Sequence, residues 1–123
     1  MAVRIITLVI LSAILCSCNK QQQAPVPSPS GLYFITTEKN TENMVRVILL
    51  DKEMNQLDLI DTRASVYSKY AHGWHHKSDH AIIYSGDVGT LSYKITNERL
   101  ETVETTDEYH KLGRKIRDKL YEK

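Results

Sequence analysis

Met44-Val45-Arg46-Val47-Ile48-Leu49-Leu50 alternates in the way typical of a half-buried strand. Val45, Val47 and Leu49 share one face of such a strand, and Arg46 lies on the other. A period of two turns one face toward a core and the other toward solvent. The stretch therefore predicts a strand of an antiparallel sheet.

Similar patterns flank this strand on both sides. Residues 32–37 are rich in aromatic and β-branched side chains and end at a turn-prone segment, residues 38–43. After a five-residue hairpin loop, residues 56–61 alternate again and should direct Leu57 and Leu59 inward. The three runs together predict an antiparallel meander.

The segment that follows is harder to assign. Ala64, Tyr67 and Tyr70 recur at helical spacing, although the residues around them would also tolerate a strand. We interpret residues 62–71 as a short helix. Residues 72–80 contain a glycine and many polar side chains, and we expect a loop.

Three further strands are expected, separated by a glycine-bounded turn and a tight Asn97-Glu98 turn, at residues 81–85, 90–96 and 99–104. In the middle strand, Leu91, Tyr93 and Ile95 share a face. These runs continue the antiparallel pattern of the first half.

The chain closes with a clear amphipathic helix. Thr105 followed by Glu108 fits a capping box, in which each side chain satisfies a free backbone N–H. An apolar stripe follows at three- and four-residue intervals and should pack across the sheet: Tyr109, Leu112, Ile116 and Leu120. The expected fold class is α+β, a small antiparallel sheet of five to six strands with a C-terminal amphipathic helix packed on it.

At the N-terminus, Leu15-Cys16-Ser17-Cys18 closes an apolar run of eleven residues that follows Arg4. As a helix the run would span roughly 16 Å, about half of a hydrocarbon core of ~30 Å. The four residues resemble the lipobox of bacterial lipoproteins, with Leu at −3, a small residue at −1 and then the lipid-bearing cysteine. Cys18 fits this pattern, whereas Cys16 follows the bulky Leu15.

The resemblance implies that residues 1–18 are a lipoprotein signal peptide and that Cys18 carries a covalent lipid, with diacylglyceryl and palmitate-like acyl chains. Two or more acyl chains give a stable membrane anchor. Asn19 stands where Asp would favour inner-membrane retention. The implied location is therefore the cell envelope, with the periplasmic face of the outer membrane favoured over the inner membrane.

Residues 19–30 contain three prolines at alternate positions and a single aliphatic residue larger than Ala, Val26. Such a segment favours extended polyproline II, and we expect a tether that reaches up to about 30 Å from the membrane. Residues 31–123 then form a single small domain.

Charge and cysteine content exclude several function classes. The chain has 16 basic and 15 acidic side chains, and without Arg4 the two kinds balance, so nothing indicates a nucleic-acid partner. Both cysteines lie in the lipobox-like stretch, so the domain has no thiol for catalysis or metal ligation. Common hydrolase and phosphate-binding motifs are absent, and we expect no enzyme.

Four of the five histidines fall close together and are candidate metal ligands: His72, His75, His76 and His80. Neutral imidazoles gathered in a loop bind zinc, copper or nickel. The alternative is a solvated loop whose histidines bind nothing, which would leave the lipid on Cys18 as the only attached group.

Tyr67, Tyr70 and Trp74 lie close in sequence and are candidates for a binding surface, because exposed aromatic side chains often anchor partners. We interpret the protein as a lipid-anchored, non-enzymatic binding or assembly module that contacts another envelope protein. The alternatives are a periplasmic metal-binding protein that uses the histidine cluster and an inhibitor of an envelope-attacking enzyme.

Overall fold

The computed structural model describes residues 24–122 and confirms the α+β class. Its elements, in chain order, are β1 (Val26–Pro27), β2 (Tyr33–Lys39), β3 (Met44–Asp51), β4 (Gln56–Ser65), β5 (Tyr70–Trp74), β6 (His80–Ser85), β7 (Leu91–Thr96), β8 (Arg99–Val103) and α1 (Asp107–Tyr121). The expected five to six strands in one sheet are corrected to eight strands in two sheets of four.

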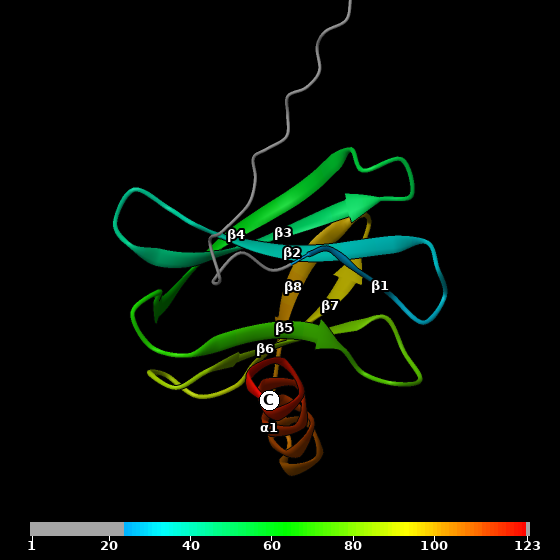
Figure 1. Cartoon of the computed structure of the whole chain (residues 1–123). Helices are drawn as coiled ribbons and strands as arrows, with labels where there is room; N and C mark the ends of the chain where they lie inside the picture. The colour runs from blue at the N-terminus through cyan, green and yellow to red at the C-terminus, as the bar shows by residue number, and fades with distance from the viewer. Residues whose placement is uncertain (1–23, 123) are drawn as a thin grey trace, which may run out of the picture.

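Each sheet is an antiparallel meander in which neighbours in sequence are neighbours in space. The first sheet has the order β1-β2-β3-β4 and the second the order β5-β6-β7-β8. The two sheets face one another, and α1 lies against β5 and β6 on the side away from β2–β4 (Figure 1). The molecule therefore has three layers.

The main core lies between the sheets. It draws fully buried side chains from β3 and β6, among them Val47, Leu49, Ala81 and Ile83, and it includes Trp74 of β5. The predicted inward face of β3 is thereby confirmed. Alternation on β3 and β7 supplies one apolar face to this core, as a half-buried strand requires.

The helix packs closely on the outer face of the second sheet because small residues let the two backbones approach. A Cβ added at Gly73 of β5 would lie 2.8 Å from Ile116 Cδ1, and one added at Gly113 of α1 would lie 2.9 Å from Thr90 Cγ2. No side chain larger than hydrogen fits at either position without a shift.

The predicted helix at residues 62–71 is wrong. β4 continues to Ser65, and β5 begins at Tyr70 after a short turn. Ala64, Val66 and Tyr70 are buried together with Val45 in a second, smaller core cluster. The spacing that suggests a helix is produced by a strand, a turn and the next strand that bury side chains in one place, so tertiary packing overrides the local pattern.

Residues 72–80 are a loop only in part. His72, Gly73 and Trp74 belong to β5, and His80 begins β6, which leaves residues 75–79 as the hairpin connection. β5 is one of the two edge strands of the second sheet, and β8 is the other.

The expected inward direction of Leu59 is also wrong. The pairing of β3 with β4 shifts register between Leu49 and Leu50, which marks an irregularity of the β-bulge kind. Leu57, which the shift leaves without a partner on β3, packs on the core, as does Ile60 beyond it, while Leu59 is 37% exposed. A one-residue slip exchanges the two faces of a strand, and the sequence pattern gave no sign of it.

The helix begins one residue later than the capping box predicts. Thr106 is the N-cap, and its hydroxyl accepts the Tyr109 N–H at 3.3 Å. Thr105 instead forms a 2.7 Å hydrogen bond with the Ser92 hydroxyl. The start of the apolar stripe is at least half-buried, but Leu120 at its end is 45% exposed.

Residues 24–30, which the sequence assigns to the tether, lie against the folded domain, and we call them the arm. Val26 and Pro27 form β1 and pair with Ile35 and Phe34 of β2. The arm is also held by β5, because the Trp74 indole N–H donates to the Val26 carbonyl at 2.8 Å. This part of the predicted tether is therefore corrected to folded structure.

Most of the predictions for the N-terminus concern residues before residue 24. The signal peptide of residues 1–18, the lipid on Cys18 and the tether residues 19–23 lie outside the described residues. Within residues 24–122, α1 lacks the length and apolar character needed to cross a bilayer.

Candidate functional site

The four candidate metal ligands are separated by the structure. His72 points into the space between the sheets, and His80 forms a 2.6 Å hydrogen bond from its Nδ1 to the Tyr109 hydroxyl on α1. His75 and His76 remain together in the β5–β6 connection, where their rings stack with centroids 4.5 Å apart.

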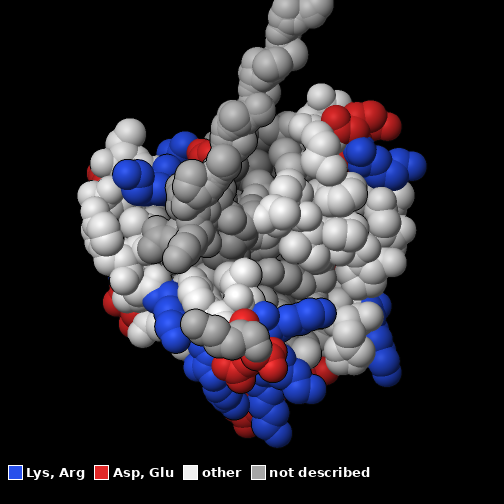
Figure 2. Space-filling view, in the orientation of Figure 1, with Lys and Arg blue, Asp and Glu red and all other residues white. Residues whose placement is uncertain are grey.

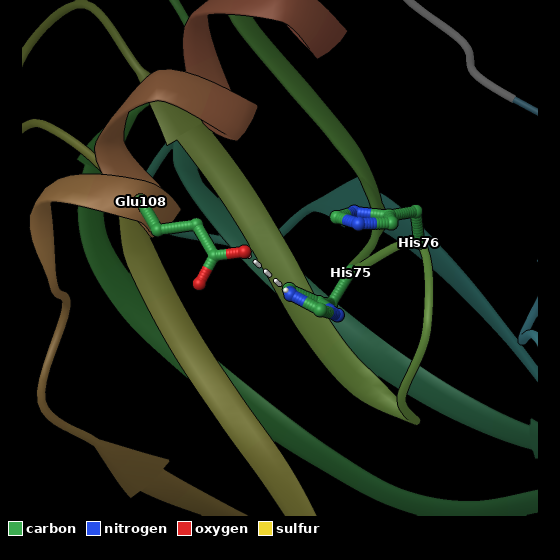
Figure 3. A group of neighbouring side chains, drawn as sticks. All are labelled: His75, His76 and Glu108. Carbon is green, nitrogen blue, oxygen red and sulfur yellow. Dashed lines mark hydrogen bonds and ion pairs between the residues drawn. The ribbon is translucent and has the colours of Figure 1, made fainter.

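Glu108 joins this pair from the first turn of α1. Its Oε2 lies 3.0 Å from His75 Nε2, and Figure 3 shows the carboxylate reaching from the helix toward the His75 ring. One ligand atom from each of His75, His76 and Glu108 lies within 4.8 Å of the others. Two imidazoles and a carboxylate form a donor set that suits zinc.

The hydrogen bonds of His75, however, place its ring proton on Nε2, the atom that would have to bind a metal. The Lys77 backbone N–H donates to His75 Nδ1 at 3.1 Å, so Nδ1 carries no proton in this arrangement. Nε2 must then carry the proton, which it donates to Glu108. A metal-bound imidazole normally donates from its other nitrogen, and here that nitrogen already accepts a hydrogen bond.

The His75–Glu108 contact therefore acts first as a link between the β5–β6 connection and the start of α1. The His75 side chain is 12% exposed and the Glu108 side chain 59%. Metal ligation at His75 Nε2 requires the ring or the 75–79 backbone to move away from Lys77.

Ser78 adds a further contact that resembles part of a hydrolytic site. Its hydroxyl lies 3.1 Å from His75 Nδ1, so Ser78, His75 and Glu108 form a chain of hydrogen bonds like a catalytic triad. A general base needs a free lone pair to accept the serine proton. On His75 Nδ1 that lone pair is shared with the Lys77 N–H.

His72 is a buried polar side chain with both ring nitrogens occupied. Its Nε2 lies 2.8 Å from the Ala24 carbonyl, which can only accept, so Nε2 donates and Nδ1 accepts from the Thr37 hydroxyl at 3.0 Å. Burial lowers the pKa of His72 below its ordinary value. The ring is accordingly neutral near pH 7 and fastens the arm to β5.

The three aromatic residues proposed as a binding surface do not form one exposed surface. Tyr67 is 78% exposed, but Tyr70 and Trp74 are only 4% and 9% exposed. The Tyr121 hydroxyl donates to the Tyr70 carbonyl at 3.0 Å, and Trp74 belongs to the main core. The sequence shows that these side chains are large but not which face of β5 they occupy.

A cleft of about 540 Å³ opens where the arm, β5 and α1 meet, and we call it the arm–helix cleft. The arm contributes Ala24 and Val26, β5 contributes residues 71–74, and α1 contributes Ile116, Lys119 and Leu120. Its volume lies in the range typical of small-molecule sites. Its walls are chiefly aliphatic and aromatic.

Two polar side chains in the cleft walls donate their ring N–H groups within the protein. Trp74 donates its indole N–H to Val26, and His72 donates to Ala24. The side chains in the cleft therefore offer a mainly apolar surface, apart from that of Lys119.

Figure 2 shows that basic side chains gather over α1 on the face drawn, with acidic side chains among them. The Arg117 guanidinium is engaged, because its Nε donates to Asp118 Oδ1 at 2.7 Å and its Nη1 donates to the Tyr84 hydroxyl at 3.2 Å. A second hollow of about 310 Å³ lies beside these residues and is lined by Tyr121 and four charged residues: Lys69, Arg117, Asp118 and Glu122.

Sequence reasoning missed Glu108 as a partner of His75 and missed the cleft. Glu108 was assigned to a capping box, and nothing local connects it with a residue 33 positions earlier. The cleft had one signal, since Ala71 and Gly73 are small residues on one face of a strand, as expected where a helix packs closely. The arm that completes it gave no signal.

Neither a family model, nor a curated protein, nor a solved structure was found to match this chain.

Proposed function

We propose that this protein is a lipid-anchored, non-enzymatic binding module of the cell envelope and that the arm–helix cleft is its binding site. The lipobox-like residues 15–18 support the anchor on Cys18 and an outer-membrane, periplasm-facing location. The observation that carries the binding function is the cleft, a mainly apolar hollow in which the ring N–H groups of His72 and Trp74 are paired internally.

The hydrogen bonds around His75 favour a binding role over a catalytic one. The hydrogen-bonded chain Ser78–His75–Glu108 has no free general base, because the Lys77 backbone N–H already donates to His75 Nδ1. A metal-binding role would need the same ring to change its protonated nitrogen. The cleft requires no rearrangement to accept an apolar group.

The anchor is tested by metabolic labelling with an alkyne analogue of palmitate. We expect the wild-type chain and Cys16→Ala to incorporate label and Cys18→Ala to lose it, since only Cys18 has the required neighbours. Cys16→Ala is the matched control. Label retained on Cys18→Ala would refute the anchor assignment.

The cleft is tested with N-phenylnaphthylamine, a neutral apolar fluorophore, and the full-length Cys18→Ala chain. Trp74 is the only tryptophan in the chain and lines the cleft, so energy transfer from it reports a bound probe. Leu120→Asp, at the exposed end of the cleft, should weaken binding about ten-fold through lost apolar contact.

Leu32→Asp is the matched control, because Leu32 is also exposed, at 52%, but lies outside the cleft. Equal probe binding by the two variants, or no energy transfer in the unsubstituted protein, would contradict the proposed site. Far-ultraviolet circular dichroism confirms that both variants keep the fold.

A further inference from the structure

The folded arm shortens the predicted tether and brings the cleft toward the membrane. Only residues 19–23 separate Cys18 from Ala24, which is itself in the cleft wall. Six consecutive Cα steps span at most about 20 Å even in a fully extended chain. An anchor on Cys18 therefore holds this end of the cleft close to the lipid surface.

The charge at the cleft is positive. Lys119 lines it and forms no ion pair with any residue between 24 and 122. Lys115 lies one turn earlier on the same side of α1 and is exposed. Of the nearby acids, Asp118 pairs with Arg117, and Glu122 is beyond the helix end.

An apolar floor and a cation at its edge fit a ligand with an aliphatic chain and a negatively charged head. The ring N–H groups of His72 and Trp74 are not available to a ligand, because both donate to the arm. A polar ligand would leave donors and acceptors unpaired against the apolar side chains that make up most of this surface. An acyl chain has none to satisfy.

We propose that the arm–helix cleft takes one acyl chain of an anionic lipid from the membrane in which the protein is anchored, with the lipid headgroup against Lys119. This inference rests on the proposed function and names the ligand class of the same site. The positive charge of Lys119 favours an anionic headgroup. The short connection from Cys18 places the cleft near the membrane, from which the lipid would come.

The experiment uses the full-length lipidated protein in phosphatidylcholine vesicles that contain a minor fraction of a lipid with brominated acyl chains. The brominated lipid is either phosphatidylglycerol, which is anionic, or phosphatidylcholine, which is neutral. Bromine quenches tryptophan only at close approach, and Trp74 is the sole tryptophan and is 9% exposed. Quenching therefore reports a chain inside the cleft.

We expect brominated phosphatidylglycerol to quench at about one-fifth of the concentration that brominated phosphatidylcholine requires, the preference that one surface lysine gives an anionic lipid. Lys119→Glu should abolish this preference. Lys111→Glu, an exposed helix lysine outside the cleft, should keep most of it. Leu120→Asp should reduce quenching by both lipids.

Equal quenching by the two lipids would overturn the choice of an anionic headgroup while leaving the binding function intact. The absence of quenching by either lipid, in a protein that still binds N-phenylnaphthylamine, would overturn the lipid as ligand. If the fluorophore also fails to bind, the proposed function fails with it.

Discussion

The outer faces of the two sheets differ in what lies on them. The first sheet presents ionic side chains to solvent, where Arg46 Nε donates to Asp61 Oδ1 at 2.7 Å and Nη1 lies 3.5 Å from Glu38. The second sheet presents Gly73 and Ile82, paired across β5 and β6, and α1 covers them. The first sheet is half-buried, whereas the second is buried on both faces where α1 covers β5 and β6.

This difference explains why β5 has no alternating pattern. All five of its residues are buried, since one face packs in the core and the other under the helix. Glycine at position 73 lets Ile116 approach. Where α1 runs on toward Leu120 and the arm stands opposite, the close packing ends and the cleft begins.

The largest expected change in unfolding free energy distinguishes the face of the second sheet that α1 covers from the exposed face of the first sheet. Ile82→Ala should lower the free energy of unfolding by about 2–4 kcal/mol, because Ile82 is fully buried and its loss leaves a cavity under α1. Leu59→Ala, on the open face of the first sheet, should cost about 0.5 kcal/mol. Urea unfolding measures both, and similar costs would show that α1 does not seal its sheet.

A smaller effect is expected at the link between the 75–79 connection and α1. His75→Ala removes the hydrogen bond to Glu108 and should cost about 1 kcal/mol. Because Lys77 holds the proton of His75 on Nε2, zinc should leave the thermal midpoint of the unsubstituted protein unchanged. A zinc-dependent rise that both His75→Ala and His76→Ala abolish would establish a metal site instead.

The smallest effect concerns pH and the arm. Burial lowers the pKa of His72 in the folded state, so the unfolded chain takes up a proton first as the pH falls through about 6.5, the ordinary histidine value. Stability contributed by the neutral ring is therefore present above pH 6.5 and is lost as the pH falls below it, down to the folded-state pKa.

His72→Gln should flatten this loss, since glutamine can still donate to the Ala24 carbonyl but does not titrate. The measurement is the slope of unfolding free energy against pH between neutral and mildly acidic conditions. His76→Gln, at an exposed ring, is the control and should keep the wild-type slope. Parallel slopes in wild type and His72→Gln would refute the assignment.

The sequence predicts the strands well where one face meets solvent. The runs around β2, β3, β6, β7 and β8 are recognised by alternation or by turn residues, and Asn97 and Glu98 do form a tight turn with positive φ at 53° and 62°. Alternation fails at 62–71, where Tyr70 is buried by contacts with distant Val45. The alternation of side chains also does not reveal the bulge that turns Leu59 outward.

The candidate site was predictable only in its parts. Sequence proximity predicts that His75 lies near His76 but does not predict the contact with Glu108. It also does not show that His72 and His80 lie on opposite faces of the second sheet. The cleft depends on three segments far apart in the chain, and the composition of residues 24–30 predicts a free tether. Pairing of β1 with β2 adds these residues to the sheet through backbone groups, which the side-chain pattern does not reveal.

The arm also sets the boundary of any working fragment. A chain cut at Gly31, where the sequence alone places the start of the domain, would lose the acceptors at Ala24 and Val26. The His72 and Trp74 rings would then keep their N–H groups in a cleft that has lost one wall. Recombinant fragments should therefore begin before residue 24.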